Sequence, residues 1–155
     1  MQFGGRYVLR APRAAVWRAL NDAQMLKAAI PGCERIDWTG PTSLELKIRV
    51  DLGPVHPSFA GDLELTDIVE AERYRIAGRG RGGLLGLAHG AADVVLTDHP
   101  AGTELRFLAE GGASGQIMRL GRAVIGHSAQ GIIDGFFERF AAAMQVEIEV
   151  LAPAE

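Results

Sequence analysis

An alternation of apolar and charged residues between positions 44 and 52 constrains the fold of this chain more than any other feature. The apolar members are Leu44, Leu46, Ile48, Val50 and Leu52, and the charged residues between them are Glu45, Lys47, Arg49 and Asp51. Successive side chains of a β-strand point to opposite faces of its sheet, so this pattern predicts a strand with one buried and one solvated face.

Further short strands, separated by turn residues, are predicted on both sides of this one. A first strand is expected at residues 2–10, a second contains Ile36 and Trp38, and a fourth contains Phe59, Leu63 and Leu65. Later strands are expected at residues 72–80, 86–98 and 103–111. Gly40-Pro41, Gly53-Pro54 and the tetrad at 99–102 read as turns, so the seven strands form an antiparallel meander.

Helical patterns flank the meander. Pro12 begins a short helix, and Asp22 caps a second one that ends at Pro31-Gly32. After the last strand, Ser114 caps a long helix reaching about Met144, whose apolar stripe is Ile117, Leu120, Val124, Ile132, Phe136, Phe140 and Met144. The order predicts an α+β domain over residues 1–150, with a seven-stranded curved antiparallel sheet around the long C-terminal helix and a short tail at 151–155.

Glycine is unusually frequent, with 20 of 155 residues, against an average near ~7%. Four glycines interrupt the long helix, which indicates close packing or a bend there: Gly121, Gly126, Gly131 and Gly135. On the strands, the expected register points six small residues inward, namely Gly61, Gly78, Gly90, Ala92, Ala109 and Gly111. This pattern predicts a hollow between sheet and helix; the alternative is that the small residues only permit curvature and bulges.

Composition excludes several classes of function. The net charge of -3 disfavours nucleic-acid binding, which needs a basic face. Cys33 is the single cysteine, so neither an intrachain disulfide nor a cysteine metal cage is expected. The N-terminus has no signal-peptide pattern and no apolar run is long enough to span a bilayer. We therefore expect a cytoplasmic protein with at most peripheral membrane contact.

No arrangement of residues predicts catalysis, a cofactor or a metal. Gly78 to Gly83 contain the spacing G-x-G-x-x-G, but the following residues read as a strand rather than the helix that a dinucleotide fingerprint requires. The four histidines form no helical ligand pair. Asp93 and His89, on one face of one predicted strand, are weak candidates for acid/base work.

Several segments resemble the CoxG family, the G subunits of carbon monoxide dehydrogenase, which is a branch of the START-like (SRPBCC) helix-grip superfamily. The resemblance rests on the residues at 11–22, Ile30-Pro31-Gly32-Cys33-Glu34, Phe59-Ala60-Gly61, the glycine-rich stretch at 78–90, Gly115-Gln116-Ile117 and Phe136-Phe137-Glu138-Arg139-Phe140. It implies a non-catalytic accessory protein of a molybdenum hydroxylase, involved in membrane recruitment and in carrying a quinone. The sequence ends without the long membrane-binding extension of many members, so any membrane contact is expected to be indirect or brief.

Together these features predict a binding protein that holds an apolar quinone- or lipid-like molecule between sheet and long helix and contacts a partner oxidoreductase. The residues expected to line the ligand are Trp17, Leu46, Ile48, Phe59, Leu63, Ile76, Val94, Phe107, Ile117, Leu120, Gly121 and Val124. Two alternatives stay open. One is a cyclase- or hydratase-type enzyme, which would need an inward acid or base, and the other is a partner-binding domain with a filled core and no ligand.

Overall fold

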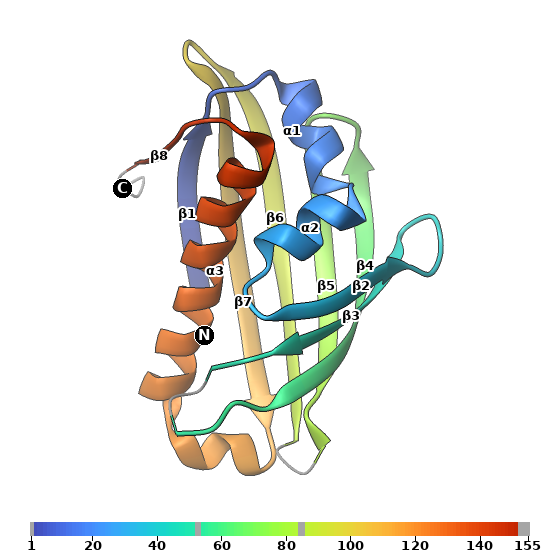
Figure 1. Ribbon diagram of the computed structural model, residues 1–155, viewed down its shortest axis with the longest axis vertical. Coiled ribbons are helices and arrows are strands. Elements are labelled where there is room, and N and C mark those ends of the chain that lie inside the picture. The colour runs from blue at the N-terminus through green and yellow to red at the C-terminus, as the bar shows by residue number, and fades with distance from the viewer. Residues whose placement is uncertain (1, 52–53, 84–85, 152–155) are drawn as a thin grey trace.

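The computed structural model describes residues 2–51, 54–83 and 86–151, and it confirms the α+β class (Figure 1). In chain order the elements are β1 (Gln2–Leu9), α1 (Arg13–Leu20), α2 (Ala23–Ala29), β2 (Cys33–Trp38), β3 (Ser43–Arg49), β4 (Ser58–Val69), β5 (Arg73–Arg81), β6 (Leu87–His99), β7 (Gly102–Ser114), the 3₁₀ helix η2 (Gln116–Leu120), α3 (Arg122–Met144) and β8 (Ile148–Leu151).

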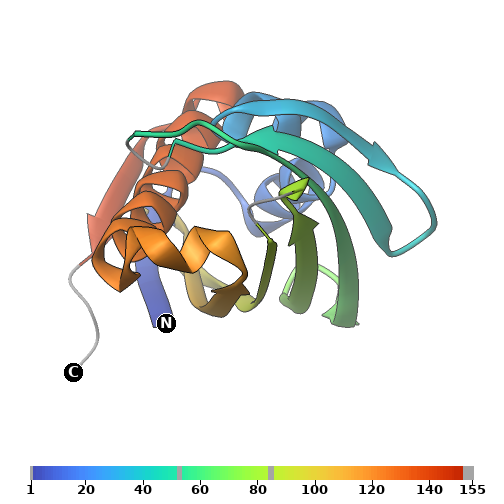
Figure 2. The same cartoon turned by 90° about the horizontal axis from the view of Figure 1, so that it is seen from below.

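One antiparallel sheet contains all the strands, in the order β2-β3-β4-β5-β6-β7-β1-β8. The meander predicted from turn residues is confirmed for β2 to β7. The sheet has eight strands instead of seven, because Ile148–Leu151 pairs with Arg6–Leu9 at its edge. Leu151, expected to begin the tail, is thus part of β8, and residues 152–155 lie outside the described residues. Seen from below, the strands curl around the side on which the helices lie (Figure 2).

The two short helices follow β1 as predicted. Asp22 caps α2 by accepting a hydrogen bond on its carboxylate from the backbone N–H of Gln24, at 2.9 Å. Val16 and Leu20 of α1 are buried, together with Ala29 of α2. Both helices lie on the same side of the sheet as α3 and cover one end of it (Figure 1).

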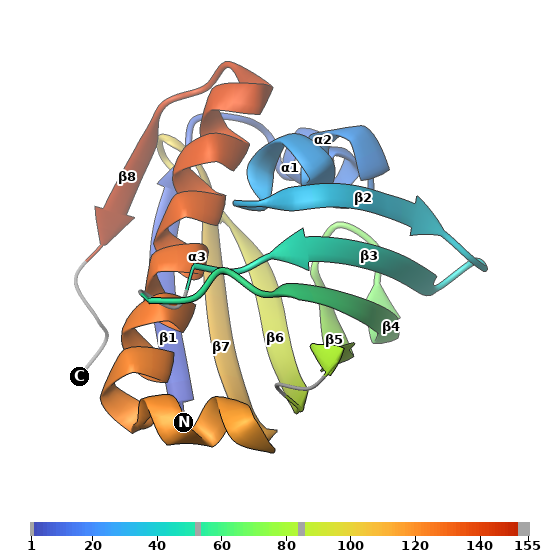
Figure 3. The same cartoon turned by 60° about the horizontal axis from the view of Figure 1, so that its bottom comes forward.

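The long helix begins seven residues later than predicted, since its N-cap is Gly121 and not Ser114. Ser114 is the last residue of β7, Gln116–Leu120 forms η2, and α3 begins at Arg122. The cause is local: Gly115 and Gly121 have φ angles of +94° and +85°, which a continuous right-handed helix cannot contain. Ile117 and Leu120 therefore belong to η2, which crosses the lower end of the sheet between β7 and α3 (Figure 3).

Close packing explains one of the helix glycines. A Cβ atom at Gly135 would lie 2.9 Å from Cγ of Pro31, at the end of α2, so α3 and this turn touch at glycine. At Gly131 a Cβ atom would meet nothing within 4 Å. Close packing therefore accounts for Gly135 and not for Gly131.

The apolar core is divided into two clusters. The larger one joins α1, the upper halves of the strands and the C-terminal half of α3, with Leu9, Leu105 and Phe140 fully buried. The smaller one centres on Phe59 and Ile117 at the lower end of the sheet. The stretch of inner sheet face between these clusters is where the sequence predicts the ligand.

Candidate functional site

The inner face between the two core clusters is built from small residues. The strand register aligns Leu63 of β4 with Gly78, Gly90 and Gly111 on β5, β6 and β7, which places three glycines side by side across the sheet. The adjacent rows contain Gly61, Gly80, Ala88 and Ala113 on one side, and Ile76, Ala92 and Ala109 on the other. We call these residues the glycine belt. All six small residues predicted to point inward lie in it.

The belt is less well covered than the face above it. Gly90 and Ala92 are half-buried, as are Leu46, Leu63 and Ile76 around them, although all lie on the face that the helices cover. A Cβ atom at Gly90 would meet the carbonyl oxygen of Glu110 at 3.3 Å and no atom of α3. Helix α3 has no buried residue before Phe137. Incomplete packing on both sides leaves apolar surface that a ligand can cover.

On the sheet side, none of the described strands presents an acid or a base to the belt. In the described part of the chain, its inner-face rows contain no Asp, Glu, His, Lys or Arg. Asp93 and His89, the weak catalytic candidates, lie on the opposite face, and Asp93 forms an ion pair with Arg75 at 2.9 Å. The belt can therefore hold a molecule by shape and apolar contact, but these two side chains cannot act on it.

The residues predicted to line the ligand fall into three groups. Val94 and Phe107 are buried in the larger cluster, with Trp17 and Ile76 packed against it. Phe59 and Ile117 are buried in the smaller cluster, with Ile48 and Leu120 packed against them. Leu46 and Leu63 lie between the clusters beside the belt.

The last two predicted lining residues lie away from this arrangement. Gly121 is an exposed residue between η2 and α3, and Val124 is 37% exposed at the start of α3, so neither is buried against the belt. The sequence predicts both to point inward because its apolar residues continue at helical spacing from Ser114. The positive φ of Gly121 breaks that helix and changes its phase.

Tyr7 also belongs to this site, although it is not among the residues predicted from the sequence. It points to the same face of β1 as Phe3 and Leu9. Its ring stacks on Phe137 of α3, with centroids 4.1 Å apart, and lies over Gly5, where a Cβ atom would meet the hydroxyl oxygen at 2.8 Å. Burial, and secondarily the negative charge of Asp134, raises the pKa of Tyr7. The side chain adds a polar group to the upper boundary of an otherwise apolar site.

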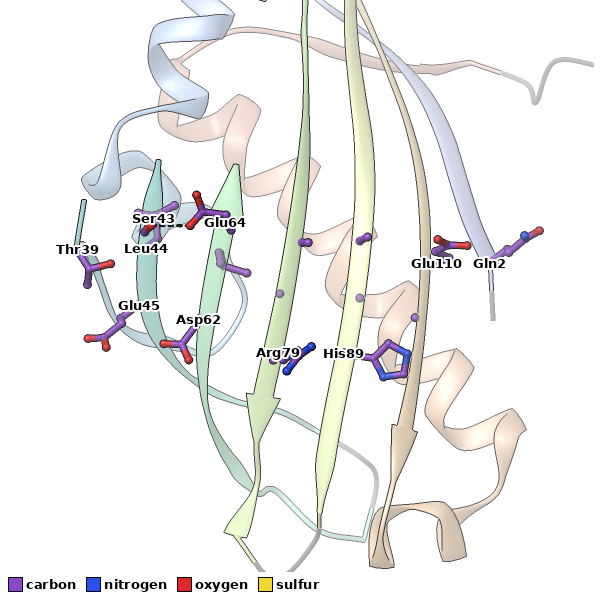
Figure 4. A pocket seen from close by; sticks show the side chains of 16 residues that line it. Gln2, Thr39, Ser43, Leu44, Glu45, Asp62, Glu64, Arg79, His89 and Glu110 are labelled. Atoms are coloured by element: carbon purple, nitrogen blue, oxygen red, sulfur yellow. Dashed lines mark hydrogen bonds between the residues drawn. The ribbon is translucent and has the colours of Figure 1, made fainter. Parts of the chain in front are cut away.

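A separate hollow of about 850 Å³ lies on the outer face of the sheet. Figure 4 views this face, with α3 behind the strands and the charged side chains in front. Ala77 and Ala91 form its floor, between Glu64 on one side and Glu110 on the other. Its charged walls do not suit an apolar ligand.

Most charged side chains around the outer hollow already form hydrogen bonds or ion pairs. Glu64 accepts hydrogen bonds from Thr42 and Ser43, which lower the pKa of its carboxyl group. Asp62 and Glu110 form ion pairs with Arg81 and Arg75. Two further side chains, Arg79 and His89, are adjacent across β5 and β6 and have no hydrogen-bond or ion-pair partner within the described residues.

The described residues were also searched for membrane-spanning helices and for groups of metal ligands. None of the described helices combines the length and the apolarity needed to cross a membrane. Within residues 2–51, 54–83 and 86–151, no three His, Cys, Asp or Glu side chains are grouped so that they could hold a metal ion.

The sequence and the structure were compared with known families and structures. The model of the CoxG family, the G subunits of carbon monoxide dehydrogenase, matches residues 5–145. No curated protein matches the sequence. A conserved protein from Geobacillus kaustophilus has a similar structure, with 21% identity, 96% of this chain and 99% of that chain covered, and a TM-score of 0.84.

Two more distant structures share the fold. A protein from Chromobacterium violaceum is 16% identical, covers 94% of this chain and 99% of its own, and has a TM-score of 0.71. The ZhuI aromatase/cyclase from Streptomyces sp. R1128 is 14% identical, with 94% of each chain covered and a TM-score of 0.65. At these identities the similarity establishes the helix-grip fold, and it carries no activity across.

Proposed function

Because the chain belongs to the CoxG family of carbon monoxide dehydrogenase, we propose that it is a non-catalytic accessory protein of a molybdenum hydroxylase of the carbon monoxide dehydrogenase type. It binds an apolar quinone- or lipid-like molecule against the glycine belt, and in this way it helps couple the enzyme to the membrane. The family match over residues 5–145 is the observation that carries the proposal.

The packing of the inner face supports the ligand part of this proposal. Small residues on three neighbouring strands and an α3 without buried residues before Phe137 leave apolar surface incompletely covered. Covering apolar surface stabilises a complex by about 25 cal/mol for each Å² removed from water. The absence of acids and bases from the described inner-face rows of the belt favours a carrier over an enzyme of the cyclase type.

Purification from the protein's own host tests both parts. We expect an affinity-tagged chain to co-purify with molybdenum, measured by elemental mass spectrometry, and with an apolar molecule seen by native mass spectrometry. Molybdenum at background level in cells that express the hydroxylase would contradict the partner. A protein that is repeatedly ligand-free, and that binds no added quinone, would contradict the carrier role.

A partner-binding domain without a ligand is the second candidate, and the outer hollow favours it. Arg79 and His89 offer an uncommitted cation and an imidazole at the rim of a cavity that no part of the described chain fills. An acidic segment of the enzyme would complement them. For this candidate, Arg79→Glu is expected to lose molybdenum on co-purification, and no apolar molecule is expected in native mass spectra of wild type or variant. Retention of molybdenum by the variant would contradict a partner site in this hollow.

A further inference from the structure

Tyr7 brings a hydroxyl group to the edge of the glycine belt between sheet and α3. Its aromatic ring contacts two other rings, Phe137 at a centroid distance of 4.1 Å and Phe107 at 6.1 Å, and these two rings also contact each other. Only 5% of the residue is exposed. The ring is therefore fixed in place, which makes the position of the hydroxyl group a property of the fold.

The hydroxyl group points along β1 toward the belt. A Cβ atom on Gly5 would lie 2.8 Å from the Tyr7 Oη atom, so the phenol lies flat over this glycine. Gly5 pairs with Phe107, and the next inward residue, Phe3, pairs with Ala109 of the belt. The absence of a side chain at position 5 gives the hydroxyl group its room.

This hydroxyl group forms no hydrogen bond to the rest of the described chain. The Tyr7 hydroxyl oxygen is not among the described side-chain atoms that are both inaccessible to solvent and without a hydrogen-bond partner. Because it is unpaired, it therefore keeps some contact with solvent. A buried phenol usually finds a partner for its O–H. An O–H group that is fixed, unpaired and accessible at the edge of an apolar site is suited to a partner that arrives with the ligand.

The charge nearby restricts what that partner can be. Asp134 of α3 lies near enough to Tyr7 to raise its pKa, and its carboxylate already accepts a hydrogen bond from Gln130 at 2.8 Å. A second carboxylate beside Tyr7 would be repelled by Asp134. A neutral oxygen would not be.

We propose that the Tyr7 hydroxyl group determines specificity at this site, because it donates a hydrogen bond to a neutral carbonyl oxygen of the bound molecule and gives no such contact to a hydrocarbon or a fatty acid. This inference rests on the proposed carrier function and assigns a residue to the recognition of its ligand. The ring system fills the belt by apolar contact, and the oxygen sets its orientation against β1.

Three probes with the same ring system test the inference, with affinities measured by calorimetry: 2,3-dimethyl-1,4-naphthoquinone, 2,3-dimethylnaphthalene and 2-naphthoate. The wild-type protein is expected to bind the quinone about 3- to 10-fold more tightly than the hydrocarbon, the gain of one neutral hydrogen bond, and to bind the carboxylate most weakly. Tyr7→Phe is expected to remove the preference for the quinone and to leave hydrocarbon binding unchanged. Tyr74→Phe, which removes a hydroxyl group from the core beside Trp17, is the matched control and should keep the preference.

The outcomes separate this inference from the function on which it rests. If the wild-type protein binds quinone and hydrocarbon equally, or if Tyr7→Phe keeps the preference, the Tyr7 role is wrong and the carrier role stands. If the wild-type protein binds none of the probes, both are wrong. The infrared carbonyl stretch of the bound quinone gives a readout that needs no variant: it should shift to lower wavenumber than in hydrocarbon solvent, and an unshifted band overturns the inference.

Discussion

Thr103 is a polar side chain in the middle of the apolar core, and its surroundings explain why it is tolerated. It is 0% exposed, and its hydroxyl group donates a hydrogen bond of 2.6 Å to the carbonyl oxygen of Ala11. This bond joins β7 to the segment between β1 and α1. A buried hydroxyl group that is satisfied in this way does not suffer the cost of an unpaired polar atom.

Replacing Thr103 by valine should therefore destabilise the protein. The change keeps the shape of the side chain and removes the hydrogen bond to Ala11, so we expect a loss of about 1–2 kcal/mol in the free energy of unfolding. Urea denaturation monitored by tryptophan fluorescence measures it. Thr97→Val, on an exposed position of β6, is the control and should change little. Equal effects of the two substitutions would show that the buried bond has no special weight.

The raised pKa of Tyr74 predicts that the free energy of unfolding changes at alkaline pH. Burial raises the pKa of this phenol above its ordinary value, which is near ~10. Below that pH the folded and unfolded states are both protonated, and the shift has no effect on stability. Above it only the unfolded state ionises, so the free energy of unfolding should fall as the pH rises. Urea unfolding between about pH 8 and 11 should show a steeper decline for wild type than for Tyr74→Phe; parallel curves would contradict this assignment.

Helix α3 contains two glycines with opposite surroundings, although they look alike in the sequence. Gly135 touches Pro31 at the end of α2, while Gly131 has open space where a side chain would be. Helical propensity alone predicts the same benefit from alanine at both positions. The tertiary contact decides between them.

Alanine substitutions at these two positions should change stability in opposite directions. Gly131→Ala should raise the free energy of unfolding by about 0.5–1 kcal/mol, because alanine loses less conformational freedom in a helix. Gly135→Ala places Cβ 2.9 Å from a rigid proline ring, and we expect a net loss of about 1 kcal/mol. Thermal and urea unfolding of both variants measures the difference. A gain at Gly135 equal to that at Gly131 would show that α2 and α3 do not pack closely there.

The molecule as a whole consists of a curled sheet with a well-packed upper end, a small cluster at the lower end, and the glycine belt between them. This division gives the proposed carrier role its physical basis. Most of the buried apolar residues belong to the upper cluster, so the middle of the inner face is free to contain small residues. A larger residue in the belt should therefore affect binding more than folding.

Gly90→Val tests this separation of roles. Valine at the centre of the belt would occupy the volume assigned to the ligand, and we expect binding of 2,3-dimethyl-1,4-naphthoquinone to weaken at least about 10-fold through steric exclusion. The free energy of unfolding should stay within about 1 kcal/mol of wild type, since valine is a better strand residue than glycine. The control is Ala91→Val, the next residue of β6, which points to the outer face. Unchanged quinone binding in Gly90→Val would place the ligand elsewhere.

Much of this architecture follows from local patterns. Alternation in β3, the turn residues between strands and the Asp22 cap are consequences of short-range sterics and hydrogen bonding, so a single sequence reveals them. The inward direction of Gly78, Gly90 and Gly111 follows from the same alternation. The break between η2 and α3 cannot be predicted in this way, because apolar residues continue at helical spacing across Gly115 and Gly121. The edge strand β8 is not predicted either, because it is short and depends on pairing with β1.

Strand periodicity and turn chemistry depend on near neighbours, so the α+β class, the antiparallel meander and the belt of small inward residues can be predicted from the amino-acid sequence. The folded structure was needed to see that Tyr7 brings its hydroxyl group to the belt, that Val124 is exposed, and that Asp93 and His89 lie on the outer face. These placements depend on how β1, η2 and α3 pack together. Contacts between residues far apart in the chain leave no periodic trace in a single sequence, so they become visible only once the sheet has curled around the helices.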